Sequence, residues 1–317
     1  MITAEELIKY DIDAIPKYIL MRDALSIDKH NEEMKNIKNM ILETKWVKDI
    51  VKLQWDDGSW GQFHSMSTSS KSSMTTESAL RRLLILGLDK DDIAIQKVLT
   101  YMKKYLNKEL DLRDYKEKKH DWDLLTRLFV AAWVLRIEPS DSVAGAIAMD
   151  WAKVITYAFS GEKYKHEAYI EAYNEVHKPH KGKALWGFQN YYIVDILPGF
   201  LDTLTESKYL DYIMTNEKGI YYIYDGNLTL KPDDFTSKHT SRYVYAFELL
   251  SRYPNAKTKL QDFIAWIKGN VSSDGFWDMG QAALDKMQFP LSDSWRKPIN
   301  RRIDSSVRLL RMLSQLE

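Results

Sequence analysis

The sequence contains no cysteine among its 317 residues. Disulfide bonds, thiolate nucleophiles and cysteine-ligated zinc are therefore excluded, and cysteine usage gives no indication of the redox compartment. The chain also lacks an excess of charge of either sign, because 45 basic side chains balance 45 acidic ones. Proteins that bind nucleic acid usually carry a basic excess, so we expect no nucleic-acid partner.

Long hydrophobic runs and targeting signals are missing as well. The longest apolar stretch, Leu128–Leu135, is far shorter than the roughly 20 residues that span a bilayer. The first residues, Met1–Lys9, have neither the basic region nor the apolar region of a secretory signal peptide. We therefore expect a cytoplasmic protein without a transmembrane segment, while its oligomeric state is unknown.

Familiar cofactor and nucleophile motifs are absent too. The sequence has no phosphate-binding glycine loop, no Gly-x-Ser-x-Gly elbow and no Rossmann fingerprint. We predict no bound cofactor and no metal site.

Aromatic residues are abundant, with 10 Trp, 19 Tyr and 10 Phe making up 12% of the chain. Many of them fall between the expected helices rather than in helical stripes. They either plug helix ends and fill a wide core or line a cavity for an apolar or planar ligand. These residues are Trp55, Trp60, Phe63, Trp186, Phe188, Tyr221, Tyr222, Phe276, Trp277 and Trp295.

The segment Gln54–Trp60 has the pattern Gln-x-x-x-Gly-x-Trp and lies between two helical runs. Gly58 can adopt the positive φ that ends a helix. Trp60 can cover the exposed end of that helix, and the amide of Gln54 can satisfy backbone groups at the next one. The pattern therefore predicts a turn that joins the ends of two helices.

The Gly-x-aromatic part of this pattern recurs at Gly219 and Gly275. The glycine spacings are 161 and 56 residues, and the first is close to three times the second. A repeat of about 54 residues, with degenerate copies in between, is typical of stacked helix pairs.

Helical runs alternate between strongly apolar and amphipathic character, which predicts buried helices covered by outer ones. The only β-prone segment, Ile220–Tyr224, is short, and Pro198 is expected to kink or break its helix. We predict an all-α fold of one domain (residues 1–317), a single toroid of five or six α/α pairs. The inner helices are expected near 12–25, 75–88, 121–137, 188–205, 239–252 and 302–316, and the outer ones near 31–53, 92–106, 143–159, 207–214 and 258–267.

The pattern at Gln54, Gly58 and Trp60 resembles the Gln-Trp repeat of the terpenoid cyclases, such as the squalene–hopene cyclases, and of the protein prenyltransferase β-subunits. This resemblance implies an α/α toroid whose central cavity holds an apolar, often isoprenoid, chain. Two family motifs have no counterpart here. The Asp-x-Asp-Asp acid is absent, since Asp121-Trp122-Asp123 continues with Leu124, and the zinc site requires a cysteine.

Three expected inner helices begin with an acid followed four residues later by an arginine: Glu77 and Arg81, Asp123 and Arg127, Asp304 and Arg308. Such pairs are either simple helical ion pairs or charges that project into the lumen or mouth. Parallel inner helices gather their N-termini at one mouth, where the potential is positive. A ring of such groups can bind a polar head group or position a general acid.

Three of the seven histidines, His64, His120 and His239, lie close to the same predicted mouth. They can transfer protons near neutral pH or, with Asp123, ligate a metal. We expect all four residues to line a single pocket. The candidate catalytic residues are His64, His120, Asp123 and Glu77, and the candidate ligand-binding residues are Arg81, Arg127, Trp186, His239, Arg242, Tyr243 and Asp304.

These features lead to one main functional hypothesis and two alternatives. The main one is a cyclase- or transferase-like protein that binds a small apolar ligand, isoprenoid- or lipid-like, with its polar or anionic head at the mouth. The second is a glycan-processing enzyme, a glycoside hydrolase or polysaccharide lyase, built on an α/α barrel. The third is a non-catalytic binding protein. An apolar or a polar lumen wall distinguishes the three.

Overall fold

The computed structural model describes residues 1–66, 72–284 and 290–316. Over these residues the chain is helical, and its only β pairing consists of isolated bridges. The expectation of an all-α fold is therefore confirmed. Within the same ranges no helix has both the length and the apolar character needed to cross a membrane.

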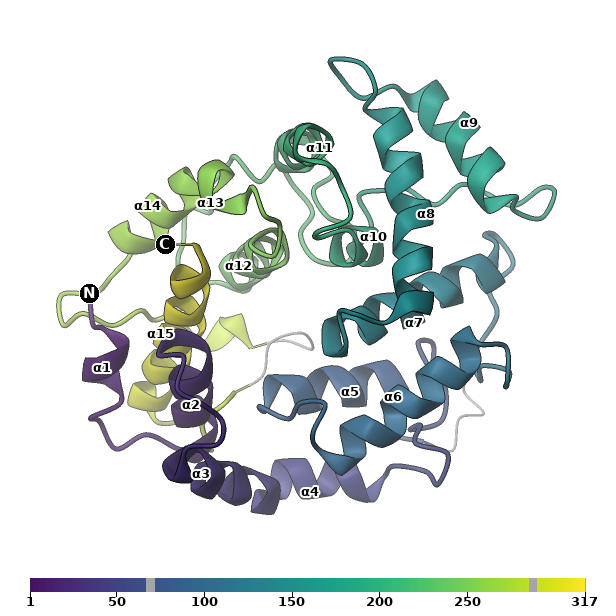
Figure 1. Cartoon of the computed structure of the whole chain (residues 1–317). Coiled ribbons are helices and arrows are strands. Elements are labelled where there is room, and N and C mark those ends of the chain that lie inside the picture. The colour runs from purple at the N-terminus through teal and green to yellow at the C-terminus, as the bar shows by residue number, and fades with distance from the viewer. Residues whose placement is uncertain (67–71, 285–289, 317) are drawn as a thin grey trace.

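One group of helices lies nearer the centre of the view in Figure 1, and a second group lies outside it. The first group comprises α2 (Ala14–Ile19), which continues as the π-helix η1 (Leu20–Ala24), α5 (Thr76–Ile85), α7 (Trp122–Ile137), α10 (Tyr191–Ile196), α12 (Lys238–Leu250) and α15 (Pro298–Leu316). The second comprises α1 (Ala4–Leu7), α3 (Glu32–Glu43), α4 (Lys45–Lys52), α6 (Ile93–Leu106), α8 (Ser142–Ala158), α9 (His166–His177), α11 (Thr203–Thr215), α13 (Ala256–Lys259) and α14 (Gln261–Gly269). A short 3-10 helix, η2 (Gln281–Ala283), precedes α15.

Three local expectations need correction. The helix expected over residues 188–205 is only α10, which ends at Ile196 because Pro198 has no backbone N–H and its ring clashes with a preceding helical turn. The helix expected over 31–53 is divided at Thr44, whose hydroxyl accepts from the backbone N–H of Val47 and caps α4. Ile220 and Tyr224 form one isolated antiparallel bridge and no strand.

The turn after α4 connects two helix ends through the motif residues. Gly58 has a φ of 90°, and a Cβ atom there would lie 2.3 Å from the carbonyl oxygen of Lys97. The side chain of Gln54 donates to the carbonyl oxygens of Gly58 and Ala94, both at 2.9 Å. Trp60 is fully buried, and its indole N–H donates over 2.7 Å to the carbonyl oxygen of Ile50, in the last turn of α4. This is the helix-end role that the sequence predicts for Trp60.

The same turn recurs after α14. Gly275 also has a φ of 90°, and Ser272 N–H donates to the carbonyl oxygen of Phe276 over 2.9 Å, as Trp55 N–H does to that of Ser59 over 2.8 Å. Trp277 is fully buried, and its indole donates to the carbonyl oxygen of Ile267, ten residues earlier. The two tryptophans therefore occupy equivalent positions in two copies of one structural unit.

The first and last helices of the chain lie side by side (Figure 1). Helix α15 packs against α1, α2 and η1. The backbone N–H of Ile2 donates to the carbonyl oxygen of Gly275 over 2.9 Å, and the Ser314 hydroxyl donates to that of Asp23 over 3.1 Å. The N-terminal helices thus complete their packing only against the C-terminal one.

We expect Trp60→Ala to destabilise the fold by about 3–5 kcal/mol, because it removes a fully buried aromatic side chain. The measurement is the free energy of unfolding by denaturant titration, with the thermal midpoint as a second reading. Trp60→Phe keeps most of the apolar volume and loses the bond to Ile50, so its cost is expected at about 1–3 kcal/mol.

Trp55→Ala is the matched control, because Trp55 is 37% exposed in the same turn. If Trp60→Ala costs no more than Trp55→Ala, then Trp60 does not close the end of α4.

Candidate functional site

The buried carboxylate of Glu77 is hydrogen-bonded by four different side chains. It accepts from Tyr192 over 2.6 Å, from the Trp133 indole over 3.0 Å and from Arg81 over 3.0 Å. Its second oxygen lies 2.7 Å from Nδ1 of His64. These four partners come from α5, α7, α10 and the segment before α5, so one carboxylate joins four parts of the chain.

The local sequence brings His64 to Glu77. Thr75 caps α5 through a capping box with Ser78. The backbone N–H groups of Thr76 and Glu77 then donate to the carbonyl oxygens of Gln62 and Phe63 over 2.8 and 3.0 Å. The segment that carries His64 is thereby fixed against the first turn of α5.

Burial and charge act in opposite directions on this pair. Burial would raise the pKa of Glu77, but the hydrogen bond from His64 and the charge of Arg81 lower this pKa to about 2. Burial would lower the pKa of His64, but its hydrogen bond with Glu77 and the charge of that carboxylate raise the pKa above 6.5. Since ionised Glu77 can only accept, Nδ1 of His64 carries the proton, and Nε2 is the nitrogen left to meet a ligand.

Aromatic rings surround His64. Its ring centroid lies 4.9 Å from Phe129, 6.2 Å from Trp122 and 6.4 Å from Tyr222. The side chain of His64 retains an exposed fraction of 20%. A histidine that is fixed by a buried carboxylate and still reaches solvent has the geometry of a general acid–base residue.

A pocket of about 560 Å³ lies on the other side of these rings, and we call it the mouth pocket. This volume falls within the range of about 300–1,000 Å³ that small-molecule sites occupy. Trp186 lies in its wall and connects it to His64, because Trp186 is 6.2 Å from Phe129 and 4.7 Å from His120. The lining residues are Lys119, His120, Trp186, Gly187, Gln189, Asn190, Lys218, Tyr221 and Asp225.

Two buried donors in this lining have no hydrogen-bond partner among the described residues: the indole N–H of Trp186 and the side-chain N–H₂ of Asn190. Trp186 is 8% exposed and Asn190 is 2% exposed. The oxygen of the Asn190 amide is already used, since it caps α10 by accepting from the backbone N–H of Tyr192. Unpaired buried donors are costly, so an acceptor beside these two groups would be favourable. Both donor atoms are covered by neighbouring atoms, and a ligand in the pocket would contact them only after a small shift of the wall.

The loop Gly219–Asp225, the tyrosine loop, lies between the predicted histidines. Tyr221 lines the mouth pocket, Tyr222 faces His64, and Tyr224 binds Nε2 of His239 over 2.8 Å. Tyr222 has a φ of 76°, a conformation that L-residues adopt rarely and that is often found at functional sites. Arg242 fixes the loop by donating to the carbonyl oxygen of Tyr222 over 2.9 Å.

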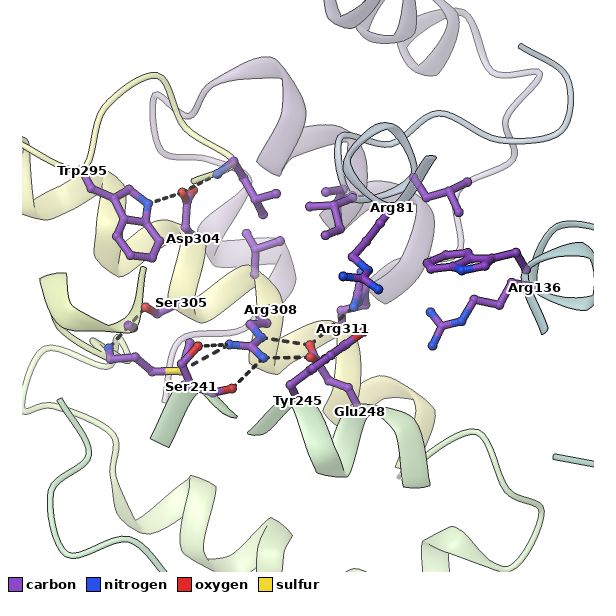
Figure 2. Close-up of a pocket in the computed structure, with 18 residues that line it drawn as sticks. Arg81, Arg136, Ser241, Tyr245, Glu248, Trp295, Asp304, Ser305, Arg308 and Arg311 are labelled. Carbon is purple, nitrogen blue, oxygen red and sulfur yellow. Dashed lines mark hydrogen bonds and ion pairs between the residues drawn. The ribbon is translucent and has the colours of Figure 1, made fainter. Parts of the chain in front are cut away.

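A second cavity, the central cavity, has a volume of about 170 Å³ and is lined by residues of α2, α5, α7, α12 and α15 (Figure 2). Four arginines face it: Arg81, Arg136, Arg308 and Arg311. Arg308 forms two hydrogen bonds with Glu248, at 3.0 and 2.8 Å. The rest of the wall is largely apolar and includes Trp133, Leu291 and Trp295.

Only one of the three predicted acid–arginine pairs forms. Glu77 binds Arg81, whereas Asp123 pairs with Lys116 on the surface. Arg127 donates to the carbonyl oxygen of Leu106. Asp304 is bonded by Trp295, by Ser292 and by the backbone N–H of Leu291, while Arg308 turns to Glu248. Burial raises the pKa of Asp304 in spite of these donors.

The predicted residues divide among several places. His120 and Trp186 share the mouth pocket, His239 and Arg242 line a neighbouring shallow pocket, and Arg81 and Asp304 line the central cavity. Tyr243 is buried, and its hydroxyl donates to the carbonyl oxygen of Leu228. His64 and Asp123 line none of these pockets. None of these three pockets is lined by all four of His64, His120, Asp123 and His239.

Sequence reasoning missed several residues that complete these sites. Tyr192 and Trp133, which bind Glu77, lie within apolar helical runs and give no polar signal of their own. Asn190 matches the pattern of a helix N-cap, and this pattern does not indicate that its side-chain N–H₂ group lacks an acceptor. Arg136 and Glu248 lie in the last turns of inner helices, at the end opposite to the predicted mouth.

No group of three or more histidine, aspartate or glutamate side chains in the described ranges has the arrangement to hold a metal ion. Comparisons with protein-family models, with curated proteins and with solved structures found no match to this chain.

We expect Glu77→Gln to reduce stability at neutral pH by about 3–5 kcal/mol, because Arg81 and His64 lose a buried anionic partner. The depressed pKa of Glu77 contributes stability above its ordinary value of 4.5, and this contribution disappears as the pH falls toward 2. Unfolding free energies measured from pH 7 downward test this. The deficit of Glu77→Gln is expected to shrink as the pH approaches 2, and a deficit that is constant across this range would contradict it.

The imidazole of His64 is expected to titrate above 6.5 in the native protein. Histidine NMR resonances followed against pH measure this value directly. In Glu77→Gln the pKa is expected to fall, since burial then acts without the carboxylate. An unchanged pKa in that variant would show that Glu77 does not set the protonation of His64.

Proposed function

We propose that this chain is an α/α toroid that binds an acidic carbohydrate chain in the mouth pocket and across the tyrosine loop, with His64 as the proton-transfer residue. This proposal develops the glycan-processing alternative. The catalytic part is a proton abstraction of the lyase type, in which a base removes a carbon-bound proton next to a carboxyl group and the glycosidic oxygen leaves.

The toroid part of the proposal is supported by the repeated turn. Two copies place a buried tryptophan and a positive-φ glycine at equivalent positions more than 200 residues apart. Helices α2, α5, α7, α12 and α15 all contribute to one central cavity. Both features fit stacked helix pairs arranged around an axis.

The observation that carries the ligand class is the pair of unpaired buried donors on Trp186 and Asn190. Hydroxyl and carboxylate oxygens supply the acceptors that these donors lack. The aromatic faces of Trp186 and Tyr221 supply flat apolar surface, and Lys119 and Lys218 supply positive charge. A polar ligand with flat apolar faces and negative charge suits this combination better than a hydrocarbon.

The acid–base part rests on the bond between His64 and Glu77. Glycoside hydrolysis usually employs two carboxylates that flank the scissile bond. The carboxylate bonded to His64 is Glu77, and its oxygens are already occupied by four donors. We therefore favour proton abstraction by Nε2 of His64. A ligand of several sugar units seated in the mouth pocket reaches it by passing Tyr222.

The central cavity gives less support to an isoprenoid-type ligand. Its volume of about 170 Å³ is below the range of ordinary small-molecule sites, and four arginines face it. A long apolar chain would desolvate these charges without pairing them. Binding of isoprenoid or lipid ligands remains a prediction of the family resemblance, and the same experiment tests it.

The experiment is a calorimetric binding panel of acidic oligosaccharides, neutral oligosaccharides and isoprenoid diphosphates, with ultraviolet absorbance to detect unsaturated products. We expect saturable binding of acidic oligosaccharides only. Trp186→Phe, which removes the donor and keeps most of the ring surface, is expected to weaken binding about 3- to 10-fold. His64→Gln is expected to retain binding and lower turnover by about 10²–10⁴-fold.

Trp151→Phe is the matched control, because the Trp151 indole is also buried and unpaired among the described residues but lies outside the mouth pocket. Equal losses in the two Trp→Phe variants would refute the assigned contact. Binding without product formation would show that the chain is a carbohydrate-binding protein and that His64 is not catalytic. Binding of isoprenoid diphosphates alone would favour the family resemblance.

A further inference from the structure

The central cavity has a concentration of positive charge that the proposed function does not use. Figure 2 shows Arg81, Arg136, Arg308 and Arg311 around it, and they come from α5, α7 and α15. These helices are distant in sequence, so their guanidinium groups meet only in the folded chain. The cavity lies on the other side of Glu77 from His64, because Arg81 and Trp133 line it and also bind Glu77.

Among the described residues, fewer carboxylates than arginines take part in the ion pairs around the cavity. The ion pairs around the cavity form a network in which Arg81 binds Glu77, Arg136 and Arg252 share Asp195, and Arg308 and Arg311 share Glu248. Five guanidinium groups therefore meet three carboxylates in this network. Asp23 also pairs with Arg311, at 3.9 Å, but it pairs with Arg22 as well. Including Asp23 and Arg22 adds one negative and one positive charge, so the excess of two positive charges is unchanged.

An ionised Asp304, the remaining acid in the wall, would lower this excess from two charges to one and so would not remove it. Asp304 accepts from Trp295, from the Ser292 side chain and from the backbone N–H groups of Leu291 and Ser292. No described arginine donates to it. The side chain of Arg308 is 9% exposed, that of Arg136 24% and that of Arg311 33%. Solvent therefore reaches this excess of charge only in part, and an anion beside these side chains would stabilise it further.

Donors are available for such an anion. Arg311 makes ion pairs at 3.5 and 3.9 Å and no hydrogen bond to a described residue through its side chain. The Nη1 group of Arg136 and the hydroxyl of Tyr245 likewise have no hydrogen bond to a described residue. All three side chains line the cavity, and guanidinium groups match the oxygens of tetrahedral anions well.

We propose that the central cavity binds a small tetrahedral oxyanion, phosphate or sulfate in size and charge, between Arg311, Arg136 and Tyr245. The cavity of about 170 Å³ suits a compact ion rather than a sugar chain. This site is separate from the mouth pocket, and it stands whether or not a carbohydrate binds there.

The site is coupled to His64 through Arg81 and Glu77. The positive charge of Arg81 lowers the pKa of His64. An anion in the cavity would offset part of that positive charge. Less of that charge then opposes protonation of His64, so its pKa is expected to rise when the anion binds. By thermodynamic linkage, protonated His64 strengthens anion binding by the same factor.

The test is calorimetric titration of the full chain with inorganic phosphate, with sulfate, and with a sugar phosphate, at constant ionic strength set by chloride. Saturable binding of phosphate or sulfate with one site per chain is expected. Arg311→Met, which keeps an apolar stem and removes the charge, is expected to weaken binding at least about tenfold. Tighter binding of the sugar phosphate than of phosphate would identify the oxyanion as part of a larger ligand.

Arg296→Met is the matched control, because Arg296 is an exposed arginine near the start of α15 and outside the cavity. Equal weakening in both variants, or no saturable binding by the wild-type chain at millimolar anion, would overturn the proposal. Thermal unfolding with and without phosphate provides a second reading if Arg311→Met is poorly stable. A His64 pKa that is unchanged at saturating phosphate would place the anion away from Arg81 and would also overturn it.

Discussion

The buried carboxylate of Glu77 is the interaction on which the centre of this molecule depends. It binds side chains of α5, α7 and α10 and of the segment before α5. Because a buried anion is stable only with such partners, each donor must hold its position for the others to be favourable. The same contacts that join these segments also fix the ring of His64. The contacts that hold the core together therefore also hold His64 in the position that proton transfer requires.

Much of the helical architecture is readable from the sequence because it depends on local patterns. The apolar run of α7 and the turn at Gly58 follow from periodicity and from glycine chemistry. In the sequence, Pro198 indicates a helix break, but α10 ends at Ile196 and is much shorter than the apolar run predicts. The association of His64, Glu77 and Arg81 was within reach because two of them are four residues apart on one helix and the third follows the repeat motif.

The other contacts depend on tertiary geometry, which local patterns do not encode. Arg308 is four residues from Asp304, yet it binds Glu248 on a neighbouring helix, because Asp304 already has donors of its own. Tyr192 and Trp133 resemble core aromatics until their polar atoms are traced to Glu77. The charged wall of the central cavity was missed for the same reason. Its four arginines lie on three helices, α5, α7 and α15, that are distant in sequence.

The contact between the two ends of the chain has a consequence for biosynthesis. Ser314 binds Asp23 across 291 residues of sequence, and Asp293 binds Asp13 across 280. At translation rates of about 5–20 residues per second, helices α2 and η1 wait roughly 15–60 s for the helix that covers them. During that time their apolar faces are exposed to other nascent chains and to chaperones. Helices α2 and η1 therefore leave the ribosome long before α15 does, but they reach their final environment only after α15 has formed.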